Sequence, residues 1–291
     1  MRKIAYLASK ATLPGSPTRR SDAFEHDRMM DALRPAFEAR NMMIEAIDWA
    51  ESGVDWARFD AVMIGTTWDY WDYQAEFLET LETIERQTKL YNGAELVRWN
   101  SHKGYLRELA DKGARLIPTL WIDQVTEAKA AEAFDTLGSD TLVFKRQVGA
   151  GADGQYRLKR GESIPAMPHP MMVQPFLPKI VEEGEISFIF VDGDFSHALI
   201  KRAAKGDYRI QSTYGGTEQA IAPNQSDLSA AQAILAALDE PPLYARVDML
   251  RGDDGGLLLM EMELIEPYLY PLEGPELGPR LAAAVERRLE K

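Results

Sequence analysis

Apolar positions form alternating strand-like and helix-like segments along residues 1–98. The strand-like runs are residues 3–9, 42–50 and 59–67, and the helix-like segments are residues 26–40 and 74–87. This alternation predicts a small α/β domain, built from βαβ units with a parallel sheet.

A second unit is expected over residues 99–173, and it opens with a helix at residues 101–113. Tyr105, Leu106 and Leu109 follow near-helical spacing, and Gly113 is a natural stop. A new segment begins at Pro118.

From Thr141 the pattern changes to long strands joined by glycine-containing turns. The expected strands are residues 141–148, 155–160, 171–177, 185–202, 207–212, 243–250 and 256–265, with hairpin turns at residues 192–194 and 253–256. Later helices are expected near residues 227–238 and from Glu276 onward. The fold class is therefore α/β followed by α+β rich in antiparallel sheet, with a last unit at residues 174–291.

Composition narrows the class of protein. The 291 residues suit about two domains, and 45% hydrophobic content fills a sizeable core. A formal net charge of -13 argues against a nucleic-acid partner, which requires a basic patch. The chain has no cysteine, so disulfides, thiolate metal sites and cysteine nucleophiles are excluded. The four histidines lack metal-ligand spacing, so zinc or histidine-based catalysis is not expected.

No targeting or membrane segment is expected. The apolar run at residues 4–8 is too short for a signal peptide, and no stretch approaches the roughly 20 apolar residues of a membrane-spanning helix. We therefore expect a cytoplasmic protein.

Two carboxylates stand out in the last long strand. Strand alternation predicts one shared face for five side chains, namely Leu257, Leu259, Glu261, Glu263 and Ile265. Same-face neighbours lie roughly 6 to 7 Å apart, so both charges would repel without a cation between them, and Mg²⁺ is the economical choice. The alternative is an exposed strand face, which the apolar neighbours make less favourable.

The preceding strand adds a cation and a third acid. Arg246 and Asp248 share a strand face, which by itself fits a simple same-strand ion pair equally well. Beside Glu261 and Glu263, Asp248 becomes a third magnesium ligand.

A lysine followed by a glycine-rich turn suggests phosphate binding. Lys145 shares a strand face with Val143, and the turn after it contains Gly149, Gly151 and Gly154 in a G-x-G-x-x-G pattern. A dinucleotide-binding version should open a helix, but another strand-like run follows, so we favour a hairpin whose N–H groups close over phosphates. An ordinary glycine turn is the alternative.

Two more cations flank a second glycine-containing loop. Lys201 ends a strand, and Arg209 shares a face with Gln211 ahead of Gly215 and Gly216. Lysine and arginine runs are usually solvated faces, so this segment indicates a site only in combination with the others.

In order along residues 99–267, these segments resemble the ATP-grasp superfamily, particularly glutathione-synthetase-like ligases and the cyclo-ligase of cycloserine biosynthesis. The matching motifs are Lys103 with its flanking residues 100–119, VFKR at 143–146, the glycine turn, VQPFL at 173–177, GEIS at 184–187, KGDYRIQ at 205–211, ARVD at 245–248 and MEMELIEP at 260–267.

The resemblance implies an ATP-grasp fold behind an N-terminal Rossmann-like domain, with residues 99–173 as the lid. It implies roles for the matching residues: Lys103 and Lys145 on ATP phosphates, Gln174, Pro175, Phe176 and Leu177 beside the adenine, Glu182 or Glu185 on the ribose, Asp248, Glu261 and Glu263 on Mg²⁺, and Lys201, Arg209 and Arg246 near the γ-phosphate. Many relatives have asparagine where this chain has Glu263. The longer spacing to Pro267 leaves open whether Glu266 also participates.

The N-terminal domain is expected to contribute the acceptor site. Residues 66–73 follow a strand end, where ligands commonly bind, and Thr67, Trp68, Asp69 and Tyr70 would hold an amine by salt bridges and cation–π contacts. An aromatic patch buried between domains is equally compatible. Gln211, Gly215 and Gly216 complete the expected substrate site.

We therefore expect a ligase that uses ATP and Mg²⁺ to join small-molecule carboxylate and amine substrates through an acyl phosphate. A small-molecule kinase and a non-catalytic ATP-binding protein are the alternatives. A homodimer is possible, and neither nucleic acid nor membrane is expected as a partner.

Overall fold

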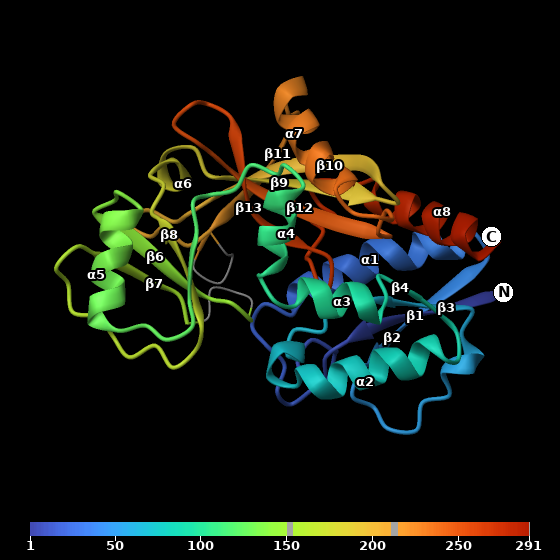
Figure 1. Cartoon of the computed structure of the whole chain (residues 1–291). Coiled ribbons are helices and arrows are strands. Elements are labelled where there is room, and N and C mark those ends of the chain that lie inside the picture. Colours follow the sequence, from blue (N-terminus) through green and yellow to red (C-terminus); the bar gives the residue numbers. More distant parts are fainter. Residues whose placement is uncertain (150–153, 211–214, 291) are drawn as a thin grey trace.

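The computed structural model describes residues 1–149, 154–210 and 215–290. Three sheets organise the chain, one at each end and one between them (Figure 1). Gly151 and Gln211 lie outside the described residues.

The first sheet is wholly parallel, as expected from the alternating pattern. Its order is β2-β1-β3-β4, with β1 at Arg2–Ala8, β2 at Met42–Asp48, β3 at Ala61–Ile64 and β4 at Lys89–Tyr91. Ile4 and Tyr6 of β1 pack in one core cluster, and Ala5 and Leu7 pack in another. Both faces of β1 are therefore buried, which explains its continuous apolar run.

Helices cover both faces of the parallel sheet. One cluster includes α1 (Phe24–Glu38) and the C-terminal helix α8 (Leu277–Glu290), and the other includes α2 (Gln74–Glu85) and α3 (Ala94–Asn100). A side-chain Cβ at Gly278 would lie 2.2 Å from the Ala32 carbonyl oxygen, so glycine permits the close approach of α8 to α1. The end of the chain thus joins the N-terminal domain (Figure 1).

The central sheet is antiparallel and has the order β11-β10-β9-β12-β13. The strands are β9 (Glu185–Val191), β10 (Asp194–Arg202), β11 (Thr217–Ile221), β12 (Tyr244–Arg251) and β13 (Leu257–Glu263), and α7 (Gln225–Ala236) packs against it. Asp192 and Gly193 both have positive φ, of 55° and 87°, in the β9–β10 turn. This is the left-handed backbone that a two-residue hairpin requires, so the predicted turn is confirmed.

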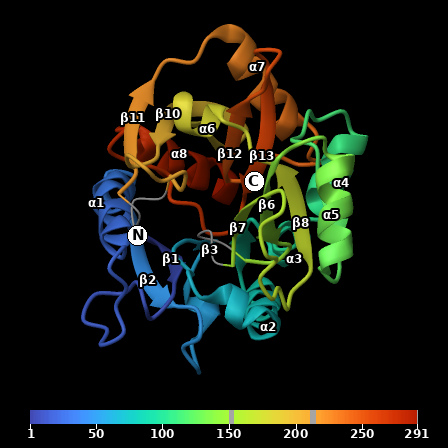
Figure 2. The same ribbon diagram turned by 90° about the vertical axis from the view of Figure 1, so that its left-hand side faces the viewer.

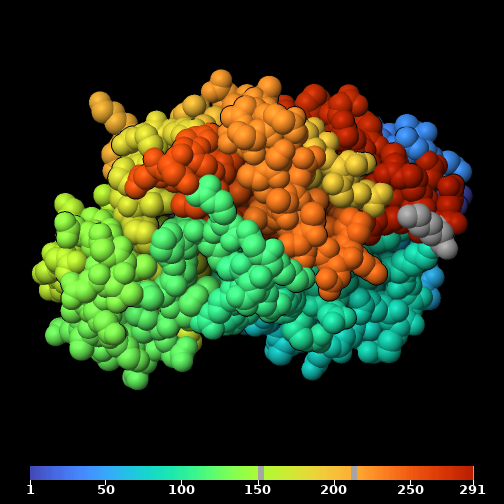
Figure 3. All heavy atoms as spheres, turned by 45° about the horizontal axis from the view of Figure 1, so that its top comes forward, coloured from blue at the N-terminus to red at the C-terminus, as the bar shows by residue number. Residues whose placement is uncertain are grey.

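The lid sheet has the order β5-β8-β6-β7 and carries one helix. Its elements are β5 (Leu120–Ile122), α5 (Glu127–Thr136), β6 (Thr141–Arg146), β7 (Tyr156–Lys159) and β8 (Met171–Pro175). Figure 2 shows its strands beside β12 and β13, with the parallel sheet below them. In the space-filling view of Figure 3, the green lid segments and the teal part of the N-terminal half lie side by side beneath the orange and red C-terminal segments.

Several local predictions differ from the structure. The helix expected at 101–113 is shorter, because residues 101–104 form turns ahead of α4 (Tyr105–Asp111). The strand expected at 207–212 is wrong over 207–210, which contain no strand, and β11 was missed. A short helix, α6 (Lys179–Glu182), precedes β9, and two 3₁₀ turns lie at Trp56–Arg58 and Tyr70–Asp72. None of the helices in the described ranges is long and apolar enough to cross a membrane.

Candidate functional site

A cavity of about 260 Å³ lies where the three sheets meet. Many of the residues singled out in the sequence line it: Trp68, Lys103, Lys145, Gly149, Gln174, Pro175, Phe176, Leu177, Glu185, Lys201, Arg209, Arg246, Asp248, Glu261 and Glu263. Side chains separated by nearly 200 positions are thus brought into one site.

Other candidate residues lie away from the cavity lining. Thr67 is fully buried, the Asp69 carboxylate accepts a hydrogen bond of 2.7 Å from the Trp49 indole, and Tyr70 is in the core behind the parallel sheet. Two later groups are also outside the lining: the exposed Glu182, which pairs with Lys179, and Gly154, Gly215 and Gly216. Of the predicted acceptor segment 66–73, Trp68 and Trp71 are therefore the residues that line the cavity.

The two adjacent carboxylates of β13 share a face, as predicted, but their apolar neighbours do not share it. The β12–β13 register shifts so that Asp248 pairs with Glu261 while Met249 pairs with Leu259, which leaves Met260 as a bulged residue. A bulge reverses the alternation of side chains beyond it. Leu257 and Leu259 therefore pack in the core below, whereas Glu261 and Glu263 line the cavity.

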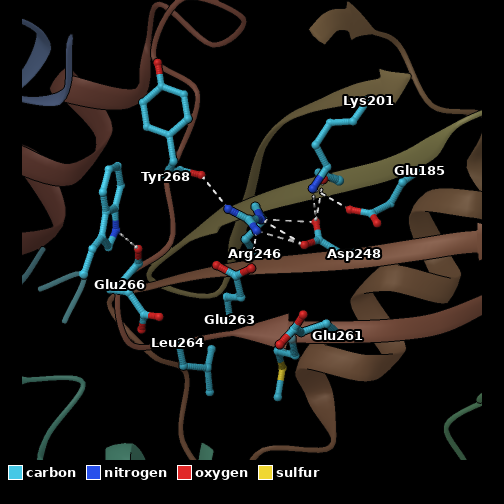
Figure 4. A network of polar contacts seen from close by, with 12 residues as sticks. Glu185, Lys201, Arg246, Asp248, Glu261, Glu263, Leu264, Glu266 and Tyr268 are labelled. Atoms are coloured by element: carbon cyan, nitrogen blue, oxygen red, sulfur yellow. Dashed lines mark hydrogen bonds and ion pairs between the residues drawn. The ribbon is translucent and has the colours of Figure 1, made fainter. Parts of the chain in front are cut away.

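Asp248 is the hub of a buried network on the central sheet (Figure 4). The Arg246 guanidinium donates to its carboxylate, with Nε 3.0 Å from Oδ2, and the Ser187 hydroxyl donates at 2.5 Å. The Lys201 ammonium lies 3.4 Å from Oδ1 and also pairs with Glu185. Burial disfavours the charged carboxylate, but Arg246 and Lys201 outweigh it and lower the pKa of Asp248.

Arg246 also links this hub to the next strand. It pairs with Glu263 and donates to the Tyr268 carbonyl at 3.0 Å. Burial raises the pKa of Glu263 to about 7, a shift that Arg246 opposes and that Glu261 and Asp248 reinforce. Crowded like charges of this kind favour a cation among them.

Lys103 contacts both β13 and the glycine turn that begins at Gly149. Its Nζ lies 2.5 Å from Glu261 Oε1 and 3.1 Å from the Gly149 carbonyl oxygen. Lys145 lies on the same cavity wall as Val143, as predicted, and makes no ion pair with a described side chain. Burial lowers the pKa of Lys145. An ammonium that faces a cavity and has no acidic partner among the described residues is suited to an anionic ligand such as phosphate.

One part of the cavity lining, which we call the apolar slot, consists of hydrophobic side chains. Ile117, Val143, Ile180 and Leu250 line it together with Phe176. Arg157 lies 3.9 Å from the centre of the Phe176 ring, and Tyr208 meets that ring edge-on. The Gln174 amide is held by a 2.9 Å hydrogen bond to Thr119. Such a slot accepts a planar ring.

Glu185 lies deep in the wall near this slot. It is fully buried and pairs with Lys201 through Oε1, while Oε2 has no hydrogen-bond partner among the described residues. Burial raises the pKa of Glu185 to about 7, although Lys201 opposes the shift. A buried, unsatisfied carboxylate oxygen favours a hydroxyl-bearing ligand beside it.

The cavity lining also contains residues that the sequence did not indicate. They are Arg20, Asp22, Glu25, Glu218, Tyr268 and Tyr270. Arg20 forms a bidentate pair with Asp22 and donates to the Trp68 carbonyl oxygen at 3.4 Å. No motif marks the loop after β1, and only the tertiary fold brings it beside Trp68.

Three carboxylates of the cavity are candidates to hold a metal ion. Asp248, Glu261 and Glu263 supply the oxygen donors that Mg²⁺ prefers and face one cavity. Across the described ranges, no three acidic or histidine side chains already converge as a metal-binding cluster. The three carboxylates are instead held by Lys103, Lys201 and Arg246. The three carboxylates are chemically suited to Mg²⁺. For the metal to bind, an anionic ligand would have to draw the cationic side chains away from them.

Comparison with known proteins places this geometry in context. Residues 4–92 match a family model described as D-cycloserine synthetase DcsG, N-terminal domain. Over 284 residues the chain is 32% identical to the cycloserine biosynthesis protein DcsG of Streptomyces lavendulae, covering 91% of this chain and 95% of that protein.

Solved structures share the whole fold. The crystal structure of D-cycloserine synthetase DcsG matches with a TM-score of 0.82 and 28% identity, over 99% of both chains. D-alanine–D-alanine ligase from Bacillus anthracis matches with a TM-score of 0.70 and 16% identity, over 100% of this chain and 98% of that one. At that identity the ligase shows likeness of fold, and the predicted ATP-grasp fold is confirmed.

Proposed function

This chain belongs to the family of the cycloserine biosynthesis protein DcsG, and we propose that it joins a small amino-acid-like carboxylate to an amine through an acyl phosphate. It is an ATP-dependent ligase of the ATP-grasp type that forms C–N bonds. The non-catalytic alternative is thereby removed. The acyl phosphate, the magnesium site and the residue roles are the proposal.

One observation carries the proposal: a single cavity joins a cation-lined wall to an acidic, aromatic end. Lys103, Lys145, Lys201 and Arg246 line the wall, and Trp68, Trp71 and Glu266 line the end. Phosphates fit among the four cations, and a small amine-bearing substrate fits at the end contributed partly by the N-terminal domain. The reacting groups would meet where these two regions join.

We assign the nucleotide by the chemistry of the walls. The adenine lies in the apolar slot by Phe176, and a ribose hydroxyl donates to the unsatisfied oxygen of Glu185. The phosphates draw Lys103 and Arg246 away from Glu261 and Glu263. With Asp248, these carboxylates would hold Mg²⁺, which neutralises charge on the terminal phosphates when bound.

The chain's own residues then position and neutralise the reacting groups. The substrate carboxylate attacks the γ-phosphorus, an acyl phosphate forms and ADP leaves. Lys201 and Arg246 neutralise the oxygens of the transferred group from the central sheet. The amine then attacks the activated carbonyl carbon, the C–N bond forms and phosphate leaves. No side chain acts as the nucleophile.

The substrate proposal also draws on a relative. D-Cycloserine, named in the matched synthetase, is a cyclic amino-acid derivative. We propose an amino-acid-like substrate for this chain. Its carboxylate reacts either with a nucleophile of the same molecule or with the amine of a second molecule.

We predict that Glu185→Gln weakens the affinity for a non-hydrolysable ATP analogue by about 10-fold, because a hydrogen bond to a charged group becomes neutral. Calorimetric titration in the presence of Mg²⁺ measures it. Glu182→Gln is the matched control, since Glu182 lies outside the cavity three residues earlier and should bind as the wild type does. Equal affinities in the two variants would remove Glu185 from the nucleotide site.

Trapping of the activated carboxylate separates the ligase from the kinase alternative. The protein is incubated with Mg-ATP, a pool of D- and L-amino acids, and hydroxylamine, which converts acyl phosphates to hydroxamates. We expect ADP, inorganic phosphate and a hydroxamate of one pool member. ADP with a stable phosphorylated hydroxyl compound, and no hydroxamate, would favour the kinase.

A further inference from the structure

Glu266 is a cavity-lining carboxyl that the mechanism above leaves without a role. It follows β13 and is 8% exposed. Its side chain forms no ion pair with any described residue, whereas Glu261, Glu263 and Asp248 are each held by a cation. Figure 4 shows Glu266 beyond Glu263, on the side away from Lys201. A buried carboxyl without a protein cation is suited to a ligand that brings a positive charge or a proton.

The main chain that carries Glu266 is fixed at three successive carbonyl groups. The Asn92 amide donates to Leu264 O at 2.8 Å, and the Tyr244 hydroxyl donates to Ile265 O at 2.9 Å. The Trp68 indole donates to Glu266 O at 3.0 Å. All three donors are buried. The main chain that carries the carboxyl is therefore fixed by a layer of buried hydrogen bonds, as it is behind reactive groups in enzymes.

The surroundings of Glu266 are those of an amine-binding site. Trp68 and Trp71 line the same end of the cavity, as do the carboxylates of Asp22 and Glu25. The one cation that the described N-terminal residues contribute to the lining, Arg20, is neutralised by its bidentate pair with Asp22. The Arg20 guanidinium also lies 5.8 Å from the centre of the Trp68 ring. A carboxyl that has no cation partner among the described residues, beside aromatic side chains, favours an amine rather than an anion.

We propose that Glu266 receives the amine nucleophile and takes its proton as the C–N bond forms. The amine, bound as the free base, donates a hydrogen bond to the carboxylate. As the nitrogen lone pair bonds to the acyl carbon, the bond from that carbon to the phosphate oxygen breaks, phosphate leaves, and the N–H proton passes to Glu266. This inference rests on the proposed ligase function and adds the group that activates its second substrate.

The electrostatics agree with this role. Burial raises the pKa of Glu266 well above its usual range, and Glu263 and Glu261 raise it further. A carboxylate with a raised pKa is a stronger proton acceptor than one in water.

The test uses Glu266→Gln in the full-length protein, with the amino-acid pool, Mg-ATP and two nucleophiles. With the pool's own amines, ligated product per ADP should fall by about 100-fold, because the glutamine amide cannot accept the proton. With added hydroxylamine, which is largely unprotonated at neutral pH, hydroxamate formation should stay within a few fold of the wild-type rate. Glu273→Gln, a half-buried glutamate of the same C-terminal segment outside the cavity lining, is the matched control and should behave as the wild type does.

Each other outcome overturns the inference. Wild-type ligation in Glu266→Gln would show that Glu266 does not handle the amine. Parallel loss of hydroxamate and ADP, with an unchanged thermal unfolding midpoint, would place Glu266 with the activation step and the metal. If the wild type itself forms no hydroxamate, the proposed ligase function is wrong. That result differs from one in which only the role of Glu266 is wrong, so the two cases are distinguishable.

Discussion

Glu261→Gln is expected to lower the rate of ADP formation by at least about 100-fold while leaving the fold intact. Glutamine keeps the volume of the side chain but removes the charge that we assign to Mg²⁺. The same charge holds Lys103, whose Nζ lies 2.5 Å from Glu261 Oε1 and touches the glycine turn. Both the metal site and the phosphate-binding lysine are therefore affected.

Nucleotide chromatography measures this loss of ADP, and circular dichroism on the same samples checks the fold. Glu132→Gln, on the exposed face of α5 in the lid, is the control for a glutamate-to-glutamine change and should retain the wild-type rate. Near-wild-type turnover in Glu261→Gln would remove the metal assignment.

Asp248→Asn should both abolish turnover and destabilise the protein by about 3 to 5 kcal/mol. Asp248 is 1% exposed and is the shared partner of Arg246 and Lys201. In the variant, Arg246 keeps Glu263 and Lys201 keeps Glu185 as its acidic partner. The protein is destabilised because breaking a buried ion pair leaves charge without a partner in the interior.

Chemical denaturation of Asp248→Asn beside Asp254→Asn isolates the effect. Asp254 pairs with Arg115 on the surface at the end of the same hairpin, where the side chains are 61% and 54% exposed. Its loss should leave the free energy of unfolding close to the wild-type value, because exposed ion pairs contribute little. Equal stabilities for the two variants would contradict the description of Asp248 as the hub of the network.

Much of the fold follows from local sequence patterns. The parallel sheet and the long hairpins were predicted because apolar runs and turn glycines are local signals. The shortest elements were missed, because strands of three residues such as Lys89–Tyr91 and Leu120–Ile122 carry too little pattern. Helix α5 had an available signal, since the Thr126 hydroxyl caps it by accepting from the Lys129 amide.

Site residues could be predicted where a chemically suitable side chain also falls on the cavity side of the alternating strand pattern. Lys145, Asp248, Glu261 and Glu263 line the cavity because alternation places them on one side of their strands. The bulge at Met260 left no mark in the sequence, so the apolar neighbours were assigned to the wrong face.

The acceptor end was the least predictable part of the site. Arg20, Asp22 and Glu25 lie in or just after a loop of ordinary composition, and the tertiary fold alone carries them to Trp68. The roles of the site residues stay predictions, and two of these residues, Gly151 and Gln211, lie outside the described residues.

The fate of the substrate's carboxylate oxygen tests the central claim most directly. The amino acid identified by hydroxamate trapping is labelled with heavy oxygen in its carboxylate and turned over with Mg-ATP, and the phosphorus products are examined by phosphorus NMR and mass spectrometry. Attack on the γ-phosphorus predicts ADP without label and inorganic phosphate carrying one labelled oxygen, since the leaving phosphate retains the former carboxylate oxygen. Label in AMP, or inorganic phosphate without label, would contradict activation as an acyl phosphate.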